Sequence, residues 1–322
     1  MKLKTIYASL KKDLSFIESE LEQTVDAHHP VLRDASNHLL KAGGKRIRPV
    51  FVLLSGKFGD YNLPLMKNVA VALELIHMAS LVHDDVIDDA EMRRGAKTIK
   101  AKWDNRVAMY TGDYIFARAI ELVTELKEPA ANTILSTAIL EMSIGEIEQI
   151  RDQFNWNQNV RDYFRRIKRK TALLIATSCE LGAVAAGASK AEQLHLKKFG
   201  YYVGMSYQIT DDILDYTGTV KQLGKPAGGD LLQGNITLPV LYAMNQGNKE
   251  EIMNVFSEEL YASQEQVNQV ISIVKSSGGI EHARDISDRY LQKAFHELNQ
   301  LPSHSARTSL RQIAEYIGKR KH

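Results

Sequence analysis

Two short stretches of this sequence gather aspartates at a density that favours metal chemistry. The stretches LVHDDVIDDAEMRRG (81–95) and GMSYQITDDILDY (204–216) hold seven of them: Asp84, Asp85, Asp88, Asp89, Asp211, Asp212 and Asp215. Carboxylates this close repel one another, and their burial is unfavourable unless a cation pairs with them. Mg²⁺ takes oxygen ligands, commonly one or two carboxylates together with substrate phosphate oxygens. The pattern therefore predicts magnesium sites that hold a diphosphate, with a solvated acidic turn as the alternative for each stretch.

Basic residues accompany the acidic stretches and indicate direct binding of anions. They are Lys45, Arg46 and Arg48 in the glycine-led segment AGGKRIRP (42–49), Arg93 and Arg94, the basic residues of RRIKRKT (165–171), and Lys225. Lys and Arg donate charge-assisted hydrogen bonds to phosphate oxygens. A metal-mediated site and a purely cationic site together predict two phosphorylated ligands, or one ligand and one product.

The basic run 165–171 has two further interpretations. A nucleic-acid patch is one, but no aromatic residues interleave with its charges and the net charge of the chain is only +2. We expect instead that most of the run is a solvated helix face, and that Lys170 and Thr171 at its apolar end reach a site.

Helices must position these side chains. Taken as one helix, residues 66–88 place His77, Ser80, Asp84 and Asp88 on one stripe, since each residue advances about 100° around the axis. In 204–216, Gly204, Gln208, Asp211 and Asp215 also recur at three- or four-residue steps, which places them on one stripe. Each acidic stretch is thus predicted to end an otherwise apolar helix.

The remainder of the chain also reads as helical. Apolar residues recur at three- and four-residue steps, and 44% of the 322 residues are hydrophobic and 25% charged, as in soluble globular proteins. We predict an all-α fold of ten or more helices in a single domain, 1–322, with two helical domains as the alternative. No secretory signal or membrane-spanning run is expected, and the single Cys179 is expected to be a small buried hydrophobe, so a cytoplasmic location is predicted.

The motifs resemble the trans-isoprenyl (polyprenyl) diphosphate synthase family along nearly the whole chain. They are GGKRIRP, ELIHMASLVHDDVIDDAEMRRG, GDY (112–114), GEIEQ (145–149), RKT (169–171), GMSYQITDDILD and LGKPAGGDLLQGNITLP. The resemblance implies an isoprenyl synthase fold, with helices around a central cavity, and Mg²⁺-dependent head-to-tail condensation of isopentenyl diphosphate with an allylic diphosphate.

The resemblance also implies a role for each matching residue. Asp84, Asp88 and Asp211 would be metal ligands, and Asp85, Asp212 and Asp215 would complete the catalytic acidic set. The isopentenyl diphosphate site would comprise Lys45, Arg48, His77 and Arg94. The allylic diphosphate site would comprise Arg93, Lys170, Thr171, Gln208 and Lys225.

Product length and partners follow from finer details. Ala79 and Ser80 are small where short-chain relatives often place an aromatic residue, which favours a heptaprenyl product, with hexaprenyl or a shorter, geranylgeranyl product as alternatives. Close helix packing is the other explanation for these two residues. The closest likeness within the family is to catalytic subunits of two-component members, in which a small non-catalytic subunit is the partner and the product serves the menaquinone side chain. A homodimer is possible for the chain alone.

Asn235 stands where many homomeric relatives have lysine, which fits the two-component subgroup. Two other functions compete with elongation. A class I terpene cyclase would lack the complete set of Lys45, Arg48, His77 and Arg94, and a scaffolding subunit could lose its acidic motifs.

Overall fold

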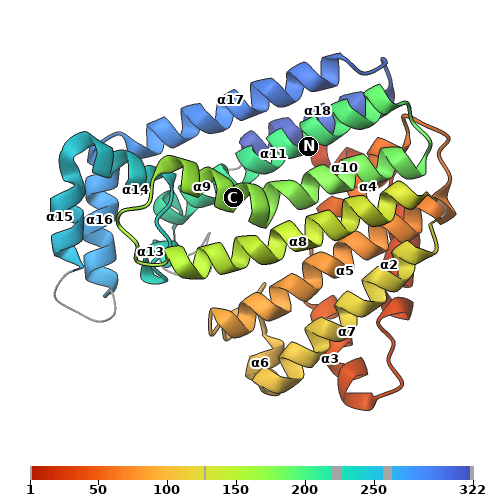
Figure 1. Cartoon of the computed structure of the whole chain (residues 1–322), viewed down its shortest axis with the longest axis horizontal. Coiled ribbons are helices and arrows are strands. Elements are labelled where there is room, and N and C mark those ends of the chain that lie inside the picture. The colour runs from red at the N-terminus through yellow and green to blue at the C-terminus, as the bar shows by residue number, and fades with distance from the viewer. Residues whose placement is uncertain (1, 127, 220–226, 257–262, 320–322) are drawn as a thin grey trace. The chain divides into compact units, whose positions relative to one another are not determined.

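The structure is a computed structural model that describes residues 2–126, 128–219, 227–256 and 263–319 (Figure 1). The predicted all-α class is confirmed. In chain order the elements of the first part are α1 (Lys2–Ser9), α2 (Lys11–Thr24), α3 (Pro30–Lys41), α4 (Ile47–Gly56), α5 (Leu63–Ile87), β1 (Met92–Arg93), β2 (Ala96–Lys97), α6 (Ile99–Lys102), α7 (Asn105–Thr124) and α8 (Pro129–Asp152). The later elements are α9 (Val160–Ile167), the π-helix η1 (Lys168–Ala172), α10 (Leu173–Ala185), α11 (Lys190–Thr217), α13 (Gly229–Leu232), α14 (Leu238–Ala243), the π-helix η2 (Met244–Asn248), α15 (Lys249–Val255), α16 (Gln264–Ser276), α17 (Gly279–Asn299) and α18 (Ser305–Gly318).

The chain divides into two compact units. Unit 1 comprises residues 1–136, 177–197 and 301–312, and unit 2 comprises residues 137–176, 198–300 and 313–322. The single domain over 1–322 therefore stays a prediction, and each unit is described by itself.

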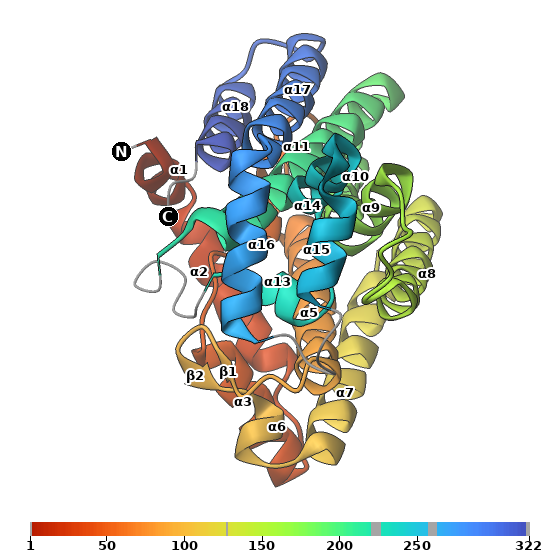
Figure 2. The ribbon, with the colours of Figure 1, turned by 90° about the vertical axis from the view of Figure 1, so that its left-hand side faces the viewer.

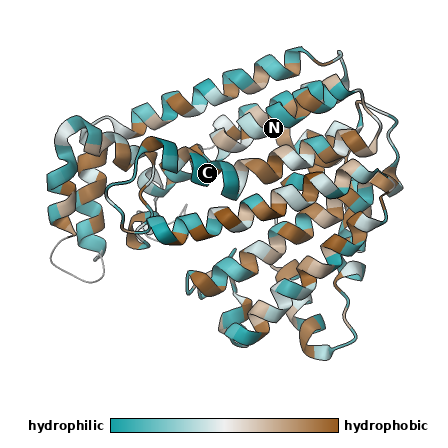
Figure 3. Ribbon diagram, viewed as in Figure 1, coloured by the Kyte–Doolittle hydropathy of each residue, from teal (hydrophilic) through white to brown (hydrophobic). Residues whose placement is uncertain are grey.

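Helix α5 is the core of unit 1. It begins where the Asn62 side chain accepts a hydrogen bond from the Leu65 backbone nitrogen at 3.4 Å, with Pro64 in the first turn. It packs against α7, α4 and α2, and hydrophobic residues recur along it in Figure 3. By length and composition α5 could cross a membrane, but 72% of its most apolar window is buried inside the protein, as in the core helix of a soluble protein.

Two short segments of unit 1 bring the basic residues toward α5. The segment 42–46 leads into α4, which begins at Ile47, so Arg48 and Pro49 lie in a helix and not in the loop predicted for 42–49. The hairpin β1–β2 pairs Met92 with Lys97 and lies near the end of α5 in the view of Figure 2.

Unit 2 has a separate apolar core, which α9, α11, α14, α16 and α17 share. Its largest buried members include Tyr163, Met205 and Tyr216. Helix α9 starts with a capping box, in which Asn159 and Asp162 satisfy each other's backbone N–H groups, and this fixes the entry to the basic run. Helix α16 starts in the same way, at Ser263 and Gln266.

Close backbone contact inside unit 1 requires glycine. A Cβ atom on Gly182 of α10 would lie 2.4 Å from the backbone oxygen of Val52 in α4. Cys179, one turn earlier on α10, is fully buried, and burial raises the pKa of its thiol to about 12. Its predicted role as a small buried hydrophobe is confirmed.

The contact predicts an effect on stability. Gly182→Ala should lower the free energy of unfolding by about 1–3 kcal/mol, because α10 and α4 must separate to admit the methyl group. Gly318→Ala is the control, since its Cβ would meet the flexible Leu291 side chain rather than backbone. Urea unfolding of both variants measures the difference, and equal losses would contradict the packing argument.

Candidate active site

The first acidic stretch lies at the carboxyl end of α5. Asp84 and Asp85 are in the last turn, and Asp88 is the capping residue, whose backbone nitrogen donates to the Asp84 carbonyl oxygen at 2.8 Å. Asp84 and Asp88 are partly exposed, whereas Asp85 is only 3% exposed. The last carbonyl groups of a helix already carry partial negative charge, so additional carboxylates here are electrostatically unfavourable without a cation.

Arg93 supplies part of that positive charge. Its Nε atom donates to the Asp85 carboxylate at 2.6 Å. Burial raises the pKa of Asp85, and the neighbouring Arg93 opposes this rise. Arg93, which was predicted to contact the allylic diphosphate, is therefore held against the acidic motif by Asp85, the buried aspartate of that motif.

The hairpin that carries Arg93 and Arg94 follows a sharp backbone reversal. Asp89, Arg94 and Gly95 all have positive φ, which allows the sharp reversal after α5. Lys100 contacts the carboxylates of Asp89 and Glu91, and the Thr98 hydroxyl donates to the Ala90 carbonyl oxygen at 2.7 Å. Asp89, the fourth aspartate of the stretch, is thus a structural partner of Lys100.

Arginines gather around His77, the first member of the predicted stripe on α5. Burial lowers the pKa of its imidazole well below the usual value, and Arg48, Arg94, Arg93 and Arg46 lower it further. The ring is therefore neutral at physiological pH and sits in a strongly positive potential. Such a potential favours a polyanion, and the neutral ring retains one N–H donor for it.

The segment 42–46 joins the same cluster. The Arg94 guanidinium donates to the Gly43 carbonyl oxygen, and a Cβ atom on Gly44 would lie 2.7 Å from Arg94 Nη1. Lys45 is exposed, and its carbonyl oxygen accepts a hydrogen bond from the Tyr7 hydroxyl. The structure thus brings Arg48 and Arg94 near His77, with Lys45 on the adjoining segment.

The second acidic stretch, in unit 2, separates its three aspartates by environment. Asp211 is exposed near the end of α11, whereas Asp212 and Asp215 are buried. The Asp212 carboxylate accepts hydrogen bonds from the Tyr163 hydroxyl at 2.7 Å and from Gln208 Nε2 at 2.8 Å. Burial raises the pKa of Asp212 to about 7, against these two hydrogen bonds.

Asp215 has a structural contact that its spacing did not indicate. Its carboxylate oxygens accept hydrogen bonds from the backbone nitrogens of Gly229 and Asp230, at 3.2 and 3.1 Å. These are the first residues of α13, so Asp215 holds the start of the segment that follows 220–226. Lys225, the last member of the predicted allylic set, lies outside the described residues.

The motif RKT (169–171) occupies the π-helix η1 between α9 and α10. The Thr171 hydroxyl donates to Gln208 Oε1 at 2.6 Å, so Thr171, Gln208, Asp212 and Tyr163 form one hydrogen-bonded chain. A Cβ atom on Gly204 would lie 2.5 Å from the Ala172 Cα atom, which shows how closely α11 approaches η1. Three of the predicted residues of unit 2 are therefore neighbours.

Lys170 also has partners on α8 in unit 2. Its Nζ atom donates to Gln149 Oε1 at 3.0 Å and to Glu146 Oε2 at 3.3 Å. Both belong to GEIEQ, a motif whose individual residues had no predicted role, and Tyr163 likewise had none. The polar residues at helical spacing in GEIEQ were the available signal for the α8 pair, whereas nothing in the sequence marked Tyr163.

The basic run departs in part from the expected solvated face, since Arg165 and Lys168 are exposed but Arg166 and Arg169 are not. Arg166 is 5% exposed and donates to the Ile236 carbonyl oxygen at 2.6 Å, and Arg169 pairs with Glu141 and Glu148 at 2.9 and 2.5 Å. Acidic side chains of α8 hold Arg169, whereas a backbone carbonyl group just before α14 holds Arg166.

The positions predicted to affect product length, and Asn235, have few polar contacts in the structure. Ala79 is fully buried, as close helix packing requires, whereas Ser80 is partly exposed and its hydroxyl donates to the His77 carbonyl oxygen at 2.9 Å. Asn235 is half-buried, and its amide contacts Gln233 Oε1 at 3.4 Å.

The donors at both helix ends suit a hard cation. Among the described residues, no three His, Cys, Asp or Glu side chains form a ready metal cluster. Mg²⁺ does not require such a cluster, since it commonly keeps waters and takes one or two carboxylates plus substrate oxygens. Asp84 and Asp88 in unit 1, and Asp211 in unit 2, offer only oxygen donors close to helix carboxyl ends, so the acidic stretch of each unit suits a magnesium ion.

Comparison with known proteins agrees with this chemistry. The profile of the family described as "Polyprenyl synthetase" matches residues 29–274. The chain is 61% identical to heptaprenyl diphosphate synthase component 2 of Bacillus subtilis, over 100% of this chain and 92% of that protein. The predicted likeness to this subgroup is confirmed.

Solved structures give the same result. The crystal structure of heptaprenyl diphosphate synthase from Staphylococcus aureus matches with a TM-score of 0.92 and 40% identity, over 97% of this chain and 99% of that one. A polyprenyl synthase from Caulobacter crescentus, complexed with calcium and isoprenyl diphosphate, has a TM-score of 0.92 and 29% identity, over 98% and 97%. The predicted isoprenyl synthase fold is confirmed.

The raised pKa of Asp212 predicts a dependence of stability on pH. Between about pH 4 and pH 7 the unfolded chain has lost this proton and the folded chain has kept it. The group therefore lowers the free energy of unfolding as pH rises, by up to about 1.4 kcal/mol per pH unit, and the loss levels off above pH 7. In metal-free buffer, Asp212→Asn should flatten this slope. Thermal unfolding across the range measures it, and parallel slopes for the two proteins would contradict the assignment.

Proposed function

The chain belongs to the polyprenyl synthetase family, and we propose that it condenses isopentenyl diphosphate head-to-tail with an allylic diphosphate to make all-trans-heptaprenyl diphosphate. The allylic substrates are farnesyl to hexaprenyl diphosphate. The observation that carries this proposal lies on α5, where an acidic motif and a cluster of arginines around a neutral histidine occur within three helical turns. One anion can bind there through a metal and the other through guanidinium groups.

The cationic cluster is the proposed site of isopentenyl diphosphate. Arg48 and Arg94 donate charge-assisted hydrogen bonds to its phosphate oxygens, the exposed Lys45 adds a further positive charge, and His77 adds a neutral donor. These groups bind the diphosphate without a metal ion, so isopentenyl diphosphate keeps its diphosphate group throughout the reaction. A terpene cyclase would have no use for this second anion site.

The acidic motifs form the proposed allylic diphosphate site. Asp84, Asp88 and Asp211 hold Mg²⁺, two or three ions per site, with Asp85, Asp212 and Asp215 in support. Arg93, Lys170, Thr171, Gln208 and Lys225 complete the allylic set. When bound, Mg²⁺ stabilises the charge that develops on the departing pyrophosphate.

The reaction exchanges one bond for another. The bond between C1 and oxygen of the allylic substrate breaks, and pyrophosphate leaves with the electron pair. The double bond of isopentenyl diphosphate then attacks C1 and forms the new carbon–carbon bond. A proton is lost to restore a double bond, and the released pyrophosphate takes it. The apolar bodies of the helices exclude water, which would otherwise capture the allylic cation.

The proposal extends to partners and location. The curated relative is named component 2, which supports a small non-catalytic partner subunit, with a homodimer for the chain alone. We propose a cytoplasmic enzyme whose lipophilic product supplies a menaquinone side chain.

Product analysis tests the proposed reaction. The purified chain is incubated with Mg²⁺, farnesyl diphosphate and labelled isopentenyl diphosphate, with and without a co-expressed small subunit. We expect a heptaprenyl product that requires the small subunit. Asp84→Asn should lower the rate by about 10²–10³-fold, on the scale of losing one charge-stabilising group in an active site. Asp89→Asn is the matched control and should retain activity, since Asp89 contacts Lys100. No incorporation in either arm, with folded protein, would refute the proposal.

Product length should depend on the size of the side chain that α5 carries at position 80. Ser80 is only partly buried, so Ser80→Phe can place a ring beyond the acidic motif with less repacking than a change at Ala79. We expect the main product to shorten by two or more isoprene units, about 10 carbon atoms, because the ring blocks further chain growth. Chromatography of the dephosphorylated products measures this. An unchanged product from an active Ser80→Phe variant would assign chain length to other residues.

A further inference from the structure

The three cations of GGKRIRP have different environments. Lys45 is exposed, and Arg48 is half-buried near His77. Arg46 lies between them in sequence but is only 9% exposed, and the proposed substrate sites do not use it. Its conformation is also unusual, because its φ of 46° and ψ of 40° are left-handed values that a side chain with a Cβ atom adopts at a cost.

Two carboxylates hold the Arg46 guanidinium. Its Nε and Nη2 atoms donate to the two oxygens of Glu18 on α2, at 2.8 and 2.6 Å. Its Nη1 atom donates to Glu74 on α5 at 3.3 Å. Glu74 is 2% exposed, and a buried carboxylate of this kind is strongly unfavourable without its cation. The arrangement therefore fixes Arg46 against two helices at once.

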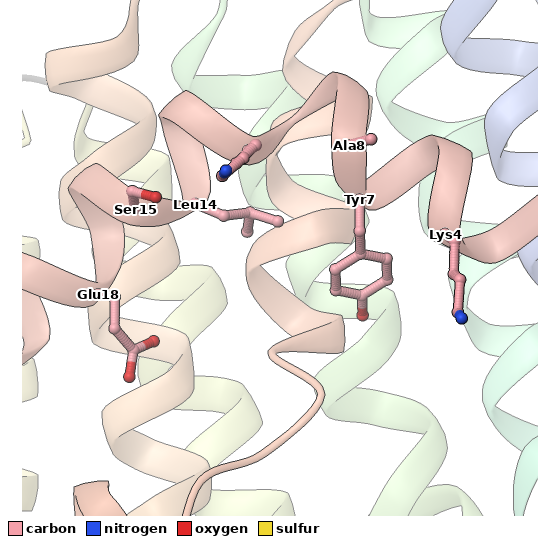
Figure 4. A pocket seen from close by; sticks show the side chains of 7 residues that line it. Lys4, Tyr7, Ala8, Leu14, Ser15 and Glu18 are labelled. Carbon is pink, nitrogen blue, oxygen red and sulfur yellow. The ribbon is translucent and has the colours of Figure 1, made fainter.

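The backbone around Arg46 is tied as well. Arg46 is the capping residue of α4, and its carbonyl oxygen accepts from the Val50 backbone nitrogen at 3.2 Å. Tyr7 of α1 donates to the neighbouring Lys45 carbonyl oxygen. Figure 4 shows Tyr7 and Glu18 among the side chains that line one groove of about 440 Å³ along α1 and α2. Side chains of α1, α2 and α5 thus hold residues 45 and 46 in place.

Glu74 connects this anchor to the proposed site. It lies three residues before His77, so both side chains lie on the same side of α5, one turn apart. We propose that Arg46 is a positioning residue, whose ion pairs with Glu18 and Glu74 hold Lys45 and Arg48 in register with His77 to bind isopentenyl diphosphate. The inference rests on the proposed function of that site and adds residues that do not touch substrate.

A direct role for Arg46 makes the opposite prediction. If Arg46 bound the diphosphate itself, Glu74→Gln would remove a competing negative charge near an anion site and would tighten binding. If Arg46 positions its neighbours, the same change loosens the segment and weakens binding. The sign of the change in affinity therefore separates the two roles.

Calorimetric titration of the full chain with isopentenyl diphosphate is the primary measurement. Glu74→Gln should weaken binding about tenfold, as expected when charged ligands lose their preorganised geometry. Glu18→Gln, at a carboxylate that is 41% exposed, is the milder variant and should weaken binding about threefold for the same reason. In steady-state assays KM for isopentenyl diphosphate should rise, while KM for farnesyl diphosphate changes by less than about twofold.

Glu20→Gln is the matched control. It removes the 2.9 Å pair between Glu20 and Lys67, which joins the same helices α2 and α5 without touching residues 42–49. This variant should leave both KM values unchanged. Tighter or unchanged binding in folded Glu74→Gln would overturn the proposal, as would equal weakening for both substrates. If Glu74→Gln does not fold, unchanged binding in Glu18→Gln overturns it. A wild-type chain that binds isopentenyl diphosphate but does not elongate it even with the small subunit present would refute only the proposed function.

Discussion

The electrostatic repulsion among aspartates at the carboxyl end of a helix is the constraint on which the functional parts of this protein depend. Asp84, Asp85 and Asp88 end α5, and Asp211, Asp212 and Asp215 lie at the end of α11. In both places the carboxylates add to the negative end of the helix dipole, which is the least favourable position for them. Folding alone would not select this arrangement, whereas a site that must attract cations would.

The protein reduces this repulsion differently for each buried acid. Asp85 pairs with Arg93, Asp212 accepts hydrogen bonds from Tyr163 and Gln208, and Asp215 caps α13. The more exposed Asp84, Asp88 and Asp211 are the acids assigned to metal. The aspartates thus divide by burial into buried members with contacts inside the protein and more exposed members, which are the ones proposed to bind metal.

Helical periodicity allowed the polar stripe on α5 to be predicted. The stripe from His77 to Asp88 follows from a constant angle per residue, and α5 (Leu63–Ile87) covers it up to Asp88, which caps the helix. Local spacing does not describe contacts between segments far apart in the chain. Arg46 and Arg48 are two residues apart and look equivalent in the sequence, yet Glu18 and Glu74 hold Arg46, whereas Arg48 is the arginine that lowers the pKa of His77 most. Tyr163 could not be selected for the same reason, because its partner Asp212 is 49 positions away.

The π-helix at 168–172 has a consequence for how this site is encoded. A π-turn contains one residue more than the α-turn it replaces, so every side chain after it is rotated relative to a regular helix. The contact between Thr171 and Gln208 therefore depends on the number of residues in that turn as well as on their types. A relative that kept the letters RKT but lost one neighbouring residue would present those side chains in another direction. Homologues of this chain are best compared at this turn by counting residues as well as by matching them.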